Sequence, residues 1–136
     1  MSDDDRLPMS DAEREVLKVL WDLGPQTVRD VLTQLTNRGQ DWSRTTVITL
    51  LQRLEGKGYV VSDKSQFAFV FRAVVTREDE MHARISDLAG KLCDGNAVPL
   101  MLAFTERHKF SAEELARFRQ MIEQLETQRG NRGKKS

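Results

Sequence analysis

The fold is decided by one stretch of the chain, Trp42-Ser43-Arg44-Thr45-Thr46-Val47-Ile48-Thr49-Leu50-Leu51-Gln52-Arg53-Leu54-Glu55-Gly56-Lys57-Gly58. Its apolar residues recur at i, i+3, i+4 and i+7, the spacing of one helix face: Val47, Leu50, Leu51 and Leu54. Ser43 is a favourable N-cap residue, and Gly58 is a favourable residue just past a helix C-terminus. The stretch therefore predicts an amphipathic helix over residues 43–57.

The opposite face of this predicted helix is polar and almost free of acidic residues. It carries Thr45, Thr49 and Gln52, while Ile48 and Arg53 lie on its flanks. Hydroxyl and amide groups can bond to base-pair edges, and threonine and isoleucine methyl groups can contact a thymine methyl. The face therefore predicts a recognition helix in the major groove of DNA. The alternative is a solvated polar face on a helix that only packs.

The charge distribution also indicates that the segment around this helix contacts DNA. The formal net charge of the 136 residues is zero, but residues 26–75 carry seven basic against four acidic side chains, whereas residues 1–25 are acidic. A local excess of positive charge is typical of a surface that contacts DNA. The low apolar share of 39% fits either a helical protein with little core per residue or one that completes its core by oligomerising.

The neighbouring segments predict a winged helix-turn-helix. Capping residues Ser10 and Thr27 precede amphipathic patterns that predict helices over 11–22 and 28–38, separated by Gly24-Pro25. After Gly58 the period changes to two, which predicts strands over 59–62 and 67–71 with a turn between them. Three helices followed by a hairpin are the order of a winged helix-turn-helix domain, here over residues 9–75.

The remainder of the chain predicts a three-helix dimerisation domain over residues 76–128. Helices are expected over 77–93, 98–107 and 112–128. Such short helices have too little core to be stable alone, so we expect a second copy of the chain to cover them. The alternative is that the apolar seam of the first of these helices forms an intramolecular core. The expected dimer interface consists of Met81, Ile85, Leu88, Leu92, Leu102, Phe104, Leu115, Phe118, Ile122 and Leu125. Residues 1–8 are expected to form a flexible arm, and 129–136 a disordered basic tail. The predicted fold class is therefore mainly α with a small β-hairpin.

The expected DNA contacts divide into two kinds. Thr45, Ile48 and Thr49 would read the sequence, with Gln52 beside them on the same face. The others would mainly hold the sugar-phosphate backbone, since they are basic or lie near a helix N-terminus: Thr27, Arg29, Arg44, Thr46, Arg53 and Lys64.

Several motifs in order resemble the penicillinase-repressor family, also called the BlaI/MecI/CopY family. They are residues 10–17, Leu20-Trp21, residues 27–31, and the series from Thr45-Thr46-Val47 through residues 50–54 to Lys57-Gly58. The resemblance covers 9–75 well and 76–126 more loosely. It implies a cytoplasmic homodimeric repressor that binds a palindromic DNA operator and is released when a membrane-bound sensor protease cuts the dimerisation region.

Three departures from the family pattern bear on function. The bond that matches the family's cleavage site is Ala103–Phe104, where the best-known members have asparagine before the phenylalanine. The copper-responsive branch carries a C-terminal cysteine cluster, and Cys93 is the only cysteine here. The family usually has glycine and arginine at the wing tip, where this chain has Ser65-Gln66, so Lys64 is the expected charged contact of the wing.

Other functions are less well supported by the sequence. His82, His108 and Cys93 have no metal-ligand spacing, and no nucleophile–base pattern or phosphate-binding glycine loop is present, so we expect no metal, no cofactor and no enzymatic activity. No apolar run approaches membrane-spanning length, so we expect no direct membrane binding and a cytoplasmic location. The alternatives to a repressor of this type are a winged-helix regulator that responds to a small molecule, and a winged helix used only for protein contacts.

Overall fold

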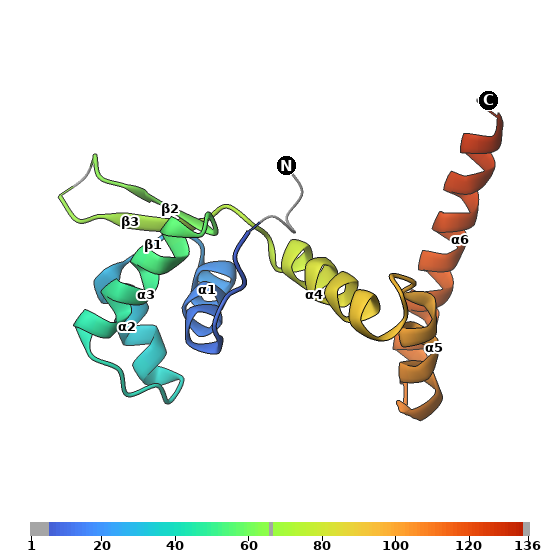
Figure 1. Cartoon of the computed structure of the whole chain (residues 1–136), viewed down its shortest axis with the longest axis horizontal. Coiled ribbons are helices and arrows are strands. Elements are labelled where there is room, and N and C mark those ends of the chain that lie inside the picture. Colours follow the sequence, from blue (N-terminus) through green and yellow to red (C-terminus); the bar gives the residue numbers. More distant parts are fainter. Residues whose placement is uncertain (1–5, 66, 135–136) are drawn as a thin grey trace.

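The computed structural model describes residues 6–65 and 67–134, which form an N-terminal domain and a helical extension. The elements in order are α1 (Asp11–Leu23), β1 (Gln26–Thr27), α2 (Val28–Asn37), α3 (Arg44–Gly56), β2 (Val60–Asp63), β3 (Val70–Ala73), α4 (Arg77–Leu92), α5 (Val98–Arg107) and α6 (Ala112–Lys134). In Figure 1, α1 to α3 and the sheet cluster together, and α4 leads away from them to α5 and α6. The predicted fold class is confirmed.

The helices begin where the sequence predicts because their caps are local hydrogen bonds. At α1, the Ser10 hydroxyl oxygen accepts from the Glu13 N–H at 3.1 Å, and the Glu13 carboxylate accepts from the Ser10 N–H at 3.0 Å. At α3, the Ser43 hydroxyl oxygen accepts from the Thr46 N–H at 3.1 Å. Such bonds satisfy N–H groups that a helix N-terminus leaves without an intrahelical partner. After α3 the chain turns at Gly58, whose φ of 88° favours glycine.

The core lies where α1, α2 and α3 meet beneath the sheet. The predicted inward face of α3 is confirmed, since Val47, Leu50, Leu51 and Leu54 are all buried. They pack in one cluster with apolar residues of α1 and α2 and with Tyr59, Val60 and Phe71 from the sheet region. Burial of this face fixes which side of α3 remains in solvent.

The sheet differs from the prediction in two respects. Its strand order is β1-β3-β2, with a two-residue strand β1 that is too short to leave a sequence pattern. The second wing strand was predicted over 67–71 but runs from Val70 to Ala73. The β2–β3 ladder ends at the pair Asp63–Val70, because the Asp63 carboxylate accepts from the N–H and hydroxyl of Ser65 and turns the chain. Phe67 and Phe69 therefore lie beyond the ladder.

The chain ends also differ from the prediction. Residues 6–8 are held against the domain: Arg6 Nε donates to the Gly58 carbonyl at 3.1 Å, and Tyr59 Oη donates to the Leu7 carbonyl at 2.7 Å. The prediction of a flexible arm is wrong for these three residues, and residues 1–5 lie outside the described part. The predicted disordered tail is helical up to Lys134, because arginine and lysine are good helix formers and each glycine costs only about 1 kcal/mol. Residues 135–136 lie outside the described part.

A buried ion pair joins the start of α1 to the end of α3. Lys57 Nζ donates to a carboxylate oxygen of Glu13 at 2.8 Å and to the Pro8 carbonyl at 2.9 Å. The Glu13 side chain is only 2% exposed. Burial alone would raise the pKa of its carboxyl group, but the hydrogen bonds from Lys57 and Ser10 outweigh burial and lower it below 4.5.

Replacing Glu13 with glutamine should lower the free energy of unfolding at pH 7 by about 1–2 kcal/mol, because a charge-assisted hydrogen bond is lost in a buried place. A carboxyl group with a lowered pKa in the folded state stabilises the fold above its unfolded pKa, and this contribution disappears as the pH falls through the folded pKa. Urea titrations at pH 7 and below pH 4.5 should therefore show a gap between wild type and Glu13→Gln that closes in acid. Glu15→Gln, which removes a more exposed pair with Lys18, is the control and should change stability by under about 0.5 kcal/mol. If the difference in stability between wild type and Glu13→Gln did not change with pH, the stabilisation could not come from the ionised Glu13 carboxylate.

The junction with α4 is fixed by polar contacts from α1. Trp21 Nε1 donates to the Val75 carbonyl at 2.9 Å. The Asp22 carboxylate accepts from Arg77 at 2.6 Å and pairs with Arg38 at 3.0 Å. Glu80, buried on α4, pairs with Arg84 and lies 3.6 Å from Arg14 of α1. These contacts set the direction in which α4 leaves the domain.

Candidate nucleic-acid interface

Helices α2 and α3 form a helix-turn-helix whose second helix is exposed on one side. Thr27 caps α2 through the Asp30 N–H at 3.1 Å, and Ser43 caps α3. Because the four leucine and valine positions of α3 face the core, Thr45, Gln52 and Arg53 are left exposed and Thr49 is half-buried. The outer face predicted from the sequence is therefore present on the molecule.

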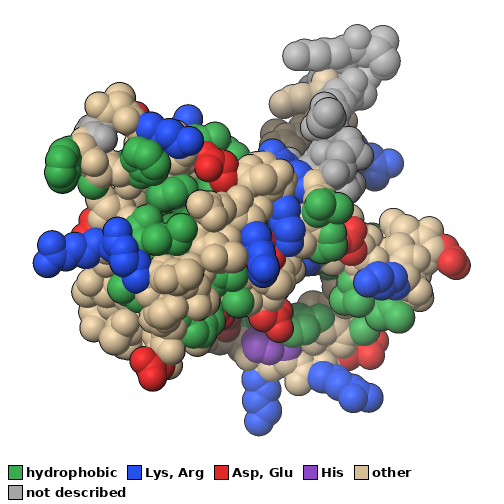
Figure 2. Space-filling model, turned by 60° about the vertical axis from the view of Figure 1, so that its left-hand side comes forward, with side chains coloured by type: hydrophobic (Ala, Val, Ile, Leu, Met, Phe, Trp, Pro, Cys, Tyr) green, Lys and Arg blue, Asp and Glu red, His purple; other side chains and the backbone are tan. Residues whose placement is uncertain are grey.

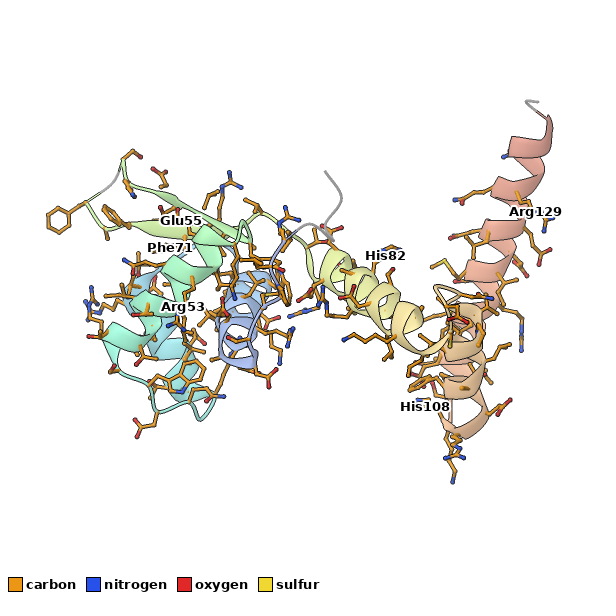
Figure 3. The ribbon with its side chains drawn as sticks, viewed as in Figure 1. Arg53, Glu55, Phe71, His82, His108 and Arg129 are labelled. Atoms are coloured by element: carbon orange, nitrogen blue, oxygen red, sulfur yellow. The ribbon has the colours of Figure 1, made fainter. Side chains whose placement is uncertain are left out.

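The acidic residue of α3 faces the protein. The Glu55 carboxylate accepts from the Ser62 N–H at 2.9 Å and from the Ser62 hydroxyl at 2.7 Å, so it ties α3 to β2 (Figure 3). Glu55 is the only acid between Arg44 and Gly56. Its engagement with the sheet leaves the outer face of α3 without a negative charge and holds the wing at a fixed position beside it.

A groove of about 760 Å³ lies between α2, α3 and the wing. Arg29 and Arg44 line it from the two helices, and Ile48 and Gln52 from the middle of α3. Phe67 and Phe69 line it from the wing. In Figure 2 hydrophobic side chains gather near basic ones on the side of the N-terminal domain that faces the viewer. Asp30 lines it as well, so the groove combines two basic side chains and one acidic side chain with an apolar wall.

The structure brings half of the predicted DNA contacts together in this groove: Thr27, Arg29, Arg44, Ile48 and Gln52. Thr45, Thr49 and Arg53 lie on α3 outside the groove lining. Two predicted contacts have local partners, since the Thr46 hydroxyl lies 3.0 Å from the Ser43 hydroxyl, and Lys64 Nζ lies 5.6 Å from the centre of the Phe69 ring. Ile48 is half-buried rather than isolated, because it shares the groove with the wing.

Sequence reasoning missed the wing aromatics as candidate site residues. The stretch Phe67-Ala68-Phe69-Val70-Phe71 predicts only a strand of the wing. In the structure Phe71 is buried at 6% exposure, whereas Phe69 is 48% exposed and Phe67 is fully exposed. The end of β2 follows from the local turn at Asp63 and Ser65, whereas the start of β3 at Val70 is set by its pairing with β2 and has no local signal in the sequence.

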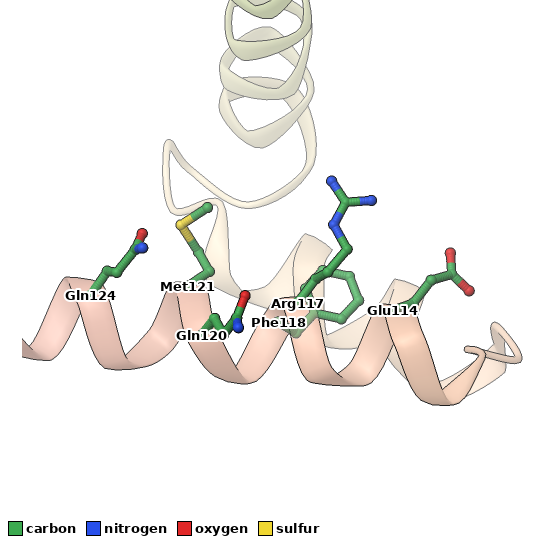
Figure 4. Close-up of a pocket in the computed structure, with 6 residues that line it drawn as sticks. All are labelled: Glu114, Arg117, Phe118, Gln120, Met121 and Gln124. Carbon is green, nitrogen blue, oxygen red and sulfur yellow. The ribbon is translucent and has the colours of Figure 1, made fainter.

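The helical extension presents a second candidate surface. All ten residues of the predicted dimer interface are exposed, with values between 45% and 68%. No side chain that the structure describes between Val98 and Asn131 is buried. Figure 4 shows one hollow of this surface on α6, lined by Phe118 and Met121 with Glu114 and Arg117 beside them. No helix in the described ranges is both long and apolar enough to cross a membrane.

The candidate cleavage bond lies in an exposed part of α5. Phe104 is 61% exposed, and its ring stacks on His108 at a centroid distance of 4.8 Å. Phe110 extends the aromatic cluster to Phe118 at 5.1 Å, which ties the end of α5 to α6. Within residues 6–65 and 67–134, no group of three or more His, Cys, Asp or Glu side chains is arranged to hold a metal ion.

The chain is similar to known repressors. A family model described as penicillinase repressor matches residues 9–124. The penicillinase repressor of Bacillus licheniformis is 28% identical over 116 residues, covering 85% of this chain and 90% of that protein. The transcriptional regulator BlaI of Mycobacterium tuberculosis is 33% identical over 126 residues, covering 91% and 89% respectively. The solution structure of monomeric Bacillus licheniformis BlaI in complex with the blaP half-operator is 32% identical, covers 55% of this chain and 90% of that one, and has a TM-score of 0.47.

Proposed function

Because the chain belongs to the penicillinase repressor family, we propose that it is a DNA-binding transcriptional repressor, and not an enzyme, that reads its operator with α3. The observation that carries this proposal is the outer face of α3. It is exposed, has no free acid, and borders a groove with Arg29 and Arg44. A surface of this kind suits the major groove, where threonine and glutamine reach base edges and arginines neutralise the flanking phosphates.

The proposed active form is a homodimer. The ten exposed apolar residues of α4, α5 and α6 would be covered by the same surface of a second copy, which gives a two-fold axis. Each copy would then read one half of a near-palindromic operator, with half-site centres about 34–36 Å or a multiple apart. The exposure of α5 and α6 supports this, since helices without any buried side chain gain little from folding alone.

Release of the operator would follow from cleavage of α5 by a sensor protease in the membrane. A cut at Ala103–Phe104 would separate α6 and its share of the interface from the DNA-binding domain. The exposure of Phe104 supports access to this bond. Mass spectrometry of the repressor purified from induced and uninduced cells tests this cleavage. A fragment that begins at Phe104 should appear only after induction.

Replacing Thr49 with alanine should weaken binding to the operator about fivefold while leaving binding to random DNA unchanged, because a contact to a base edge is lost. Replacing Lys64 with alanine should weaken both by the same factor and reduce the slope of log affinity against log salt by about one. Fluorescence anisotropy with the DNA upstream of the protein's own gene, at several salt concentrations, measures both.

Two outcomes of this experiment would count against the proposal. Equal losses on operator and random DNA for Thr49→Ala would exclude direct reading by that residue. Failure of the wild-type protein to bind any upstream fragment at low salt would overturn DNA binding itself, and would favour a winged helix used for protein contacts.

A further inference from the structure

The wing ends in two phenylalanines that are exposed to different degrees. Phe67 is fully exposed and Phe69 is 48% exposed, with only Ala68 between them. A phenylalanine that contacts nothing gives up the stabilisation of about 2 kcal/mol that its burial would supply. The same side chains form the wing wall of the groove whose other wall is α2 and α3. The unpacked rings are therefore next to the face proposed to read DNA.

The wing tip is held by its own hydrogen bonds. The Asp63 carboxylate accepts from the Ser65 N–H at 2.9 Å and from the Ser65 hydroxyl at 2.6 Å. Glu55 anchors the same end of β2 to α3, because its carboxylate accepts from the neighbouring Ser62. The two carboxylates thus act at adjacent residues where β2 ends, since Glu55 ties Ser62 to the recognition helix and Asp63 turns the chain into the tip.

The charge of the tip leaves at most one contact to a phosphate, from Lys64. The hydrogen bonds from Ser65 lower the pKa of Asp63, so its carboxylate stays ionised at neutral pH beside Lys64. The two charges offset one another, and Lys64 lies over the Phe69 ring. What the tip offers a ligand is therefore chiefly an apolar ring, and the ligand surfaces that accept a ring beside a bound helix are the minor groove and its stacked bases.

We propose that Phe67 acts as a wedge that enters the minor groove next to the segment read by α3, partly unstacks one base step and bends the operator. This inference rests on the proposed function. Phe69, carrying Lys64 above its ring, would lie against the sugars at the groove edge. Such a wedge reads deformability, so the operator should carry a flexible pyrimidine–purine step at that position, even though no side chain there bonds to a base edge.

The test compares Phe67→Ala with Phe67→Leu in the full-length dimer, with DNA bending measured by energy transfer between dyes at the two ends of an operator duplex. Phe67→Ala should bind the operator about tenfold more weakly and bend it less, as expected when a stacked aromatic ring is removed. Its salt slope should equal that of wild type, because no phosphate contact is lost. Phe67→Leu keeps an apolar wedge and should retain most of the bend. Equal melting temperatures of the three proteins establish that the fold is unaffected.

The outcomes separate this inference from the proposed function. If wild type binds and bends the operator and Phe67→Ala does so equally well, the wedge is wrong and the repressor proposal stands. If Phe67→Ala changes the oligomeric state without DNA, the ring contacts a second copy and the wedge is likewise wrong. If wild type binds no DNA, the proposed function fails, and the wedge fails with it.

Discussion

Replacing Leu51 with alanine is expected to lower the free energy of unfolding of the N-terminal domain by about 3 kcal/mol. Leu51 has no exposed surface and lies at the centre of the inward face of α3, in contact with the cluster formed by α1, α2 and the sheet. Removing a buried leucine side chain forfeits its transfer free energy and leaves a cavity that the surrounding helices fill only in part. Because domains are typically stable by only about 5–15 kcal/mol, this loss is a large share of the total.

The two tryptophans make this effect measurable in the intact chain. Trp21 and Trp42 both pack against the N-terminal core, and the chain has no other tryptophan. Their fluorescence in a urea titration therefore follows this domain and not the helical extension. Leu23→Ala, at the exposed end of α1, is the control and should cost under about 1 kcal/mol. An equal, small shift in both variants would show that α3 is not held by the core in the way described.

Helix starts and buried helix faces depend on residues close together in the sequence, and they were predicted well. The side-chain caps join residues three apart, as in Ser10 with Glu13 or Thr76 with Asp79, so the starts of these helices follow from the sequence, whereas α5 has Pro99 in its first turn and no side-chain cap. The inward face of α3 follows from its period for the same reason. The helix ends of α1 to α5 lie within a residue of their predicted positions, with α6 as the exception.

Features that depend on distant partners could not be predicted. The register of β3 is set by pairing with β2, which moved the strand from 67–71 to 70–73 and turned two phenylalanines from strand residues into an exposed tip. Lys57 was predicted only as the last residue of a helix, but its side chain reaches 44 residues back to Glu13. Residues 6–8 are held by Gly58 and Tyr59, about 50 positions away. No local pattern encodes such pairings, since each becomes defined only when the helices have packed.

The candidate site depends both on local sequence patterns and on contacts between distant residues. Its outer face on α3 is a consequence of local periodicity, whereas the groove beside it needs Glu55 to bond with Ser62 and the wing to end at Asp63. At larger scale, the separation of two recognition helices in a dimer depends on the direction of α4. That direction is held by Asp22 between Arg38 and Arg77, so the junction links the reading of one half-site to the position of the other.

Replacing Ile122 with aspartate should convert the protein to a monomer and lower its affinity for a full operator at least a hundredfold. Ile122 is 54% exposed in the single chain and lies on the apolar face of α6 with Leu115, Phe118 and Leu125. In the proposed dimer this side chain becomes buried, and an unpaired carboxylate there would lose its hydration without gaining a partner. A dimer binds its second half-site as an intramolecular event, so loss of the dimer removes an avidity gain of about 10²–10⁴.

Ala116→Asp is the matched control, because it places the same charge on the opposite face of α6 at a residue that is also exposed. Analytical ultracentrifugation should show monomers for Ile122→Asp and dimers for Ala116→Asp, and anisotropy should show the large affinity loss only in the former. Affinity for a single half-site should be the same in both variants, since α3 lies far from the change and neither substitution touches the N-terminal core (Figure 1). If Ile122→Asp stayed dimeric, the exposed face of α6 would have to bind a different partner, and the dimer that reads the two half-sites would be held by α4 and α5.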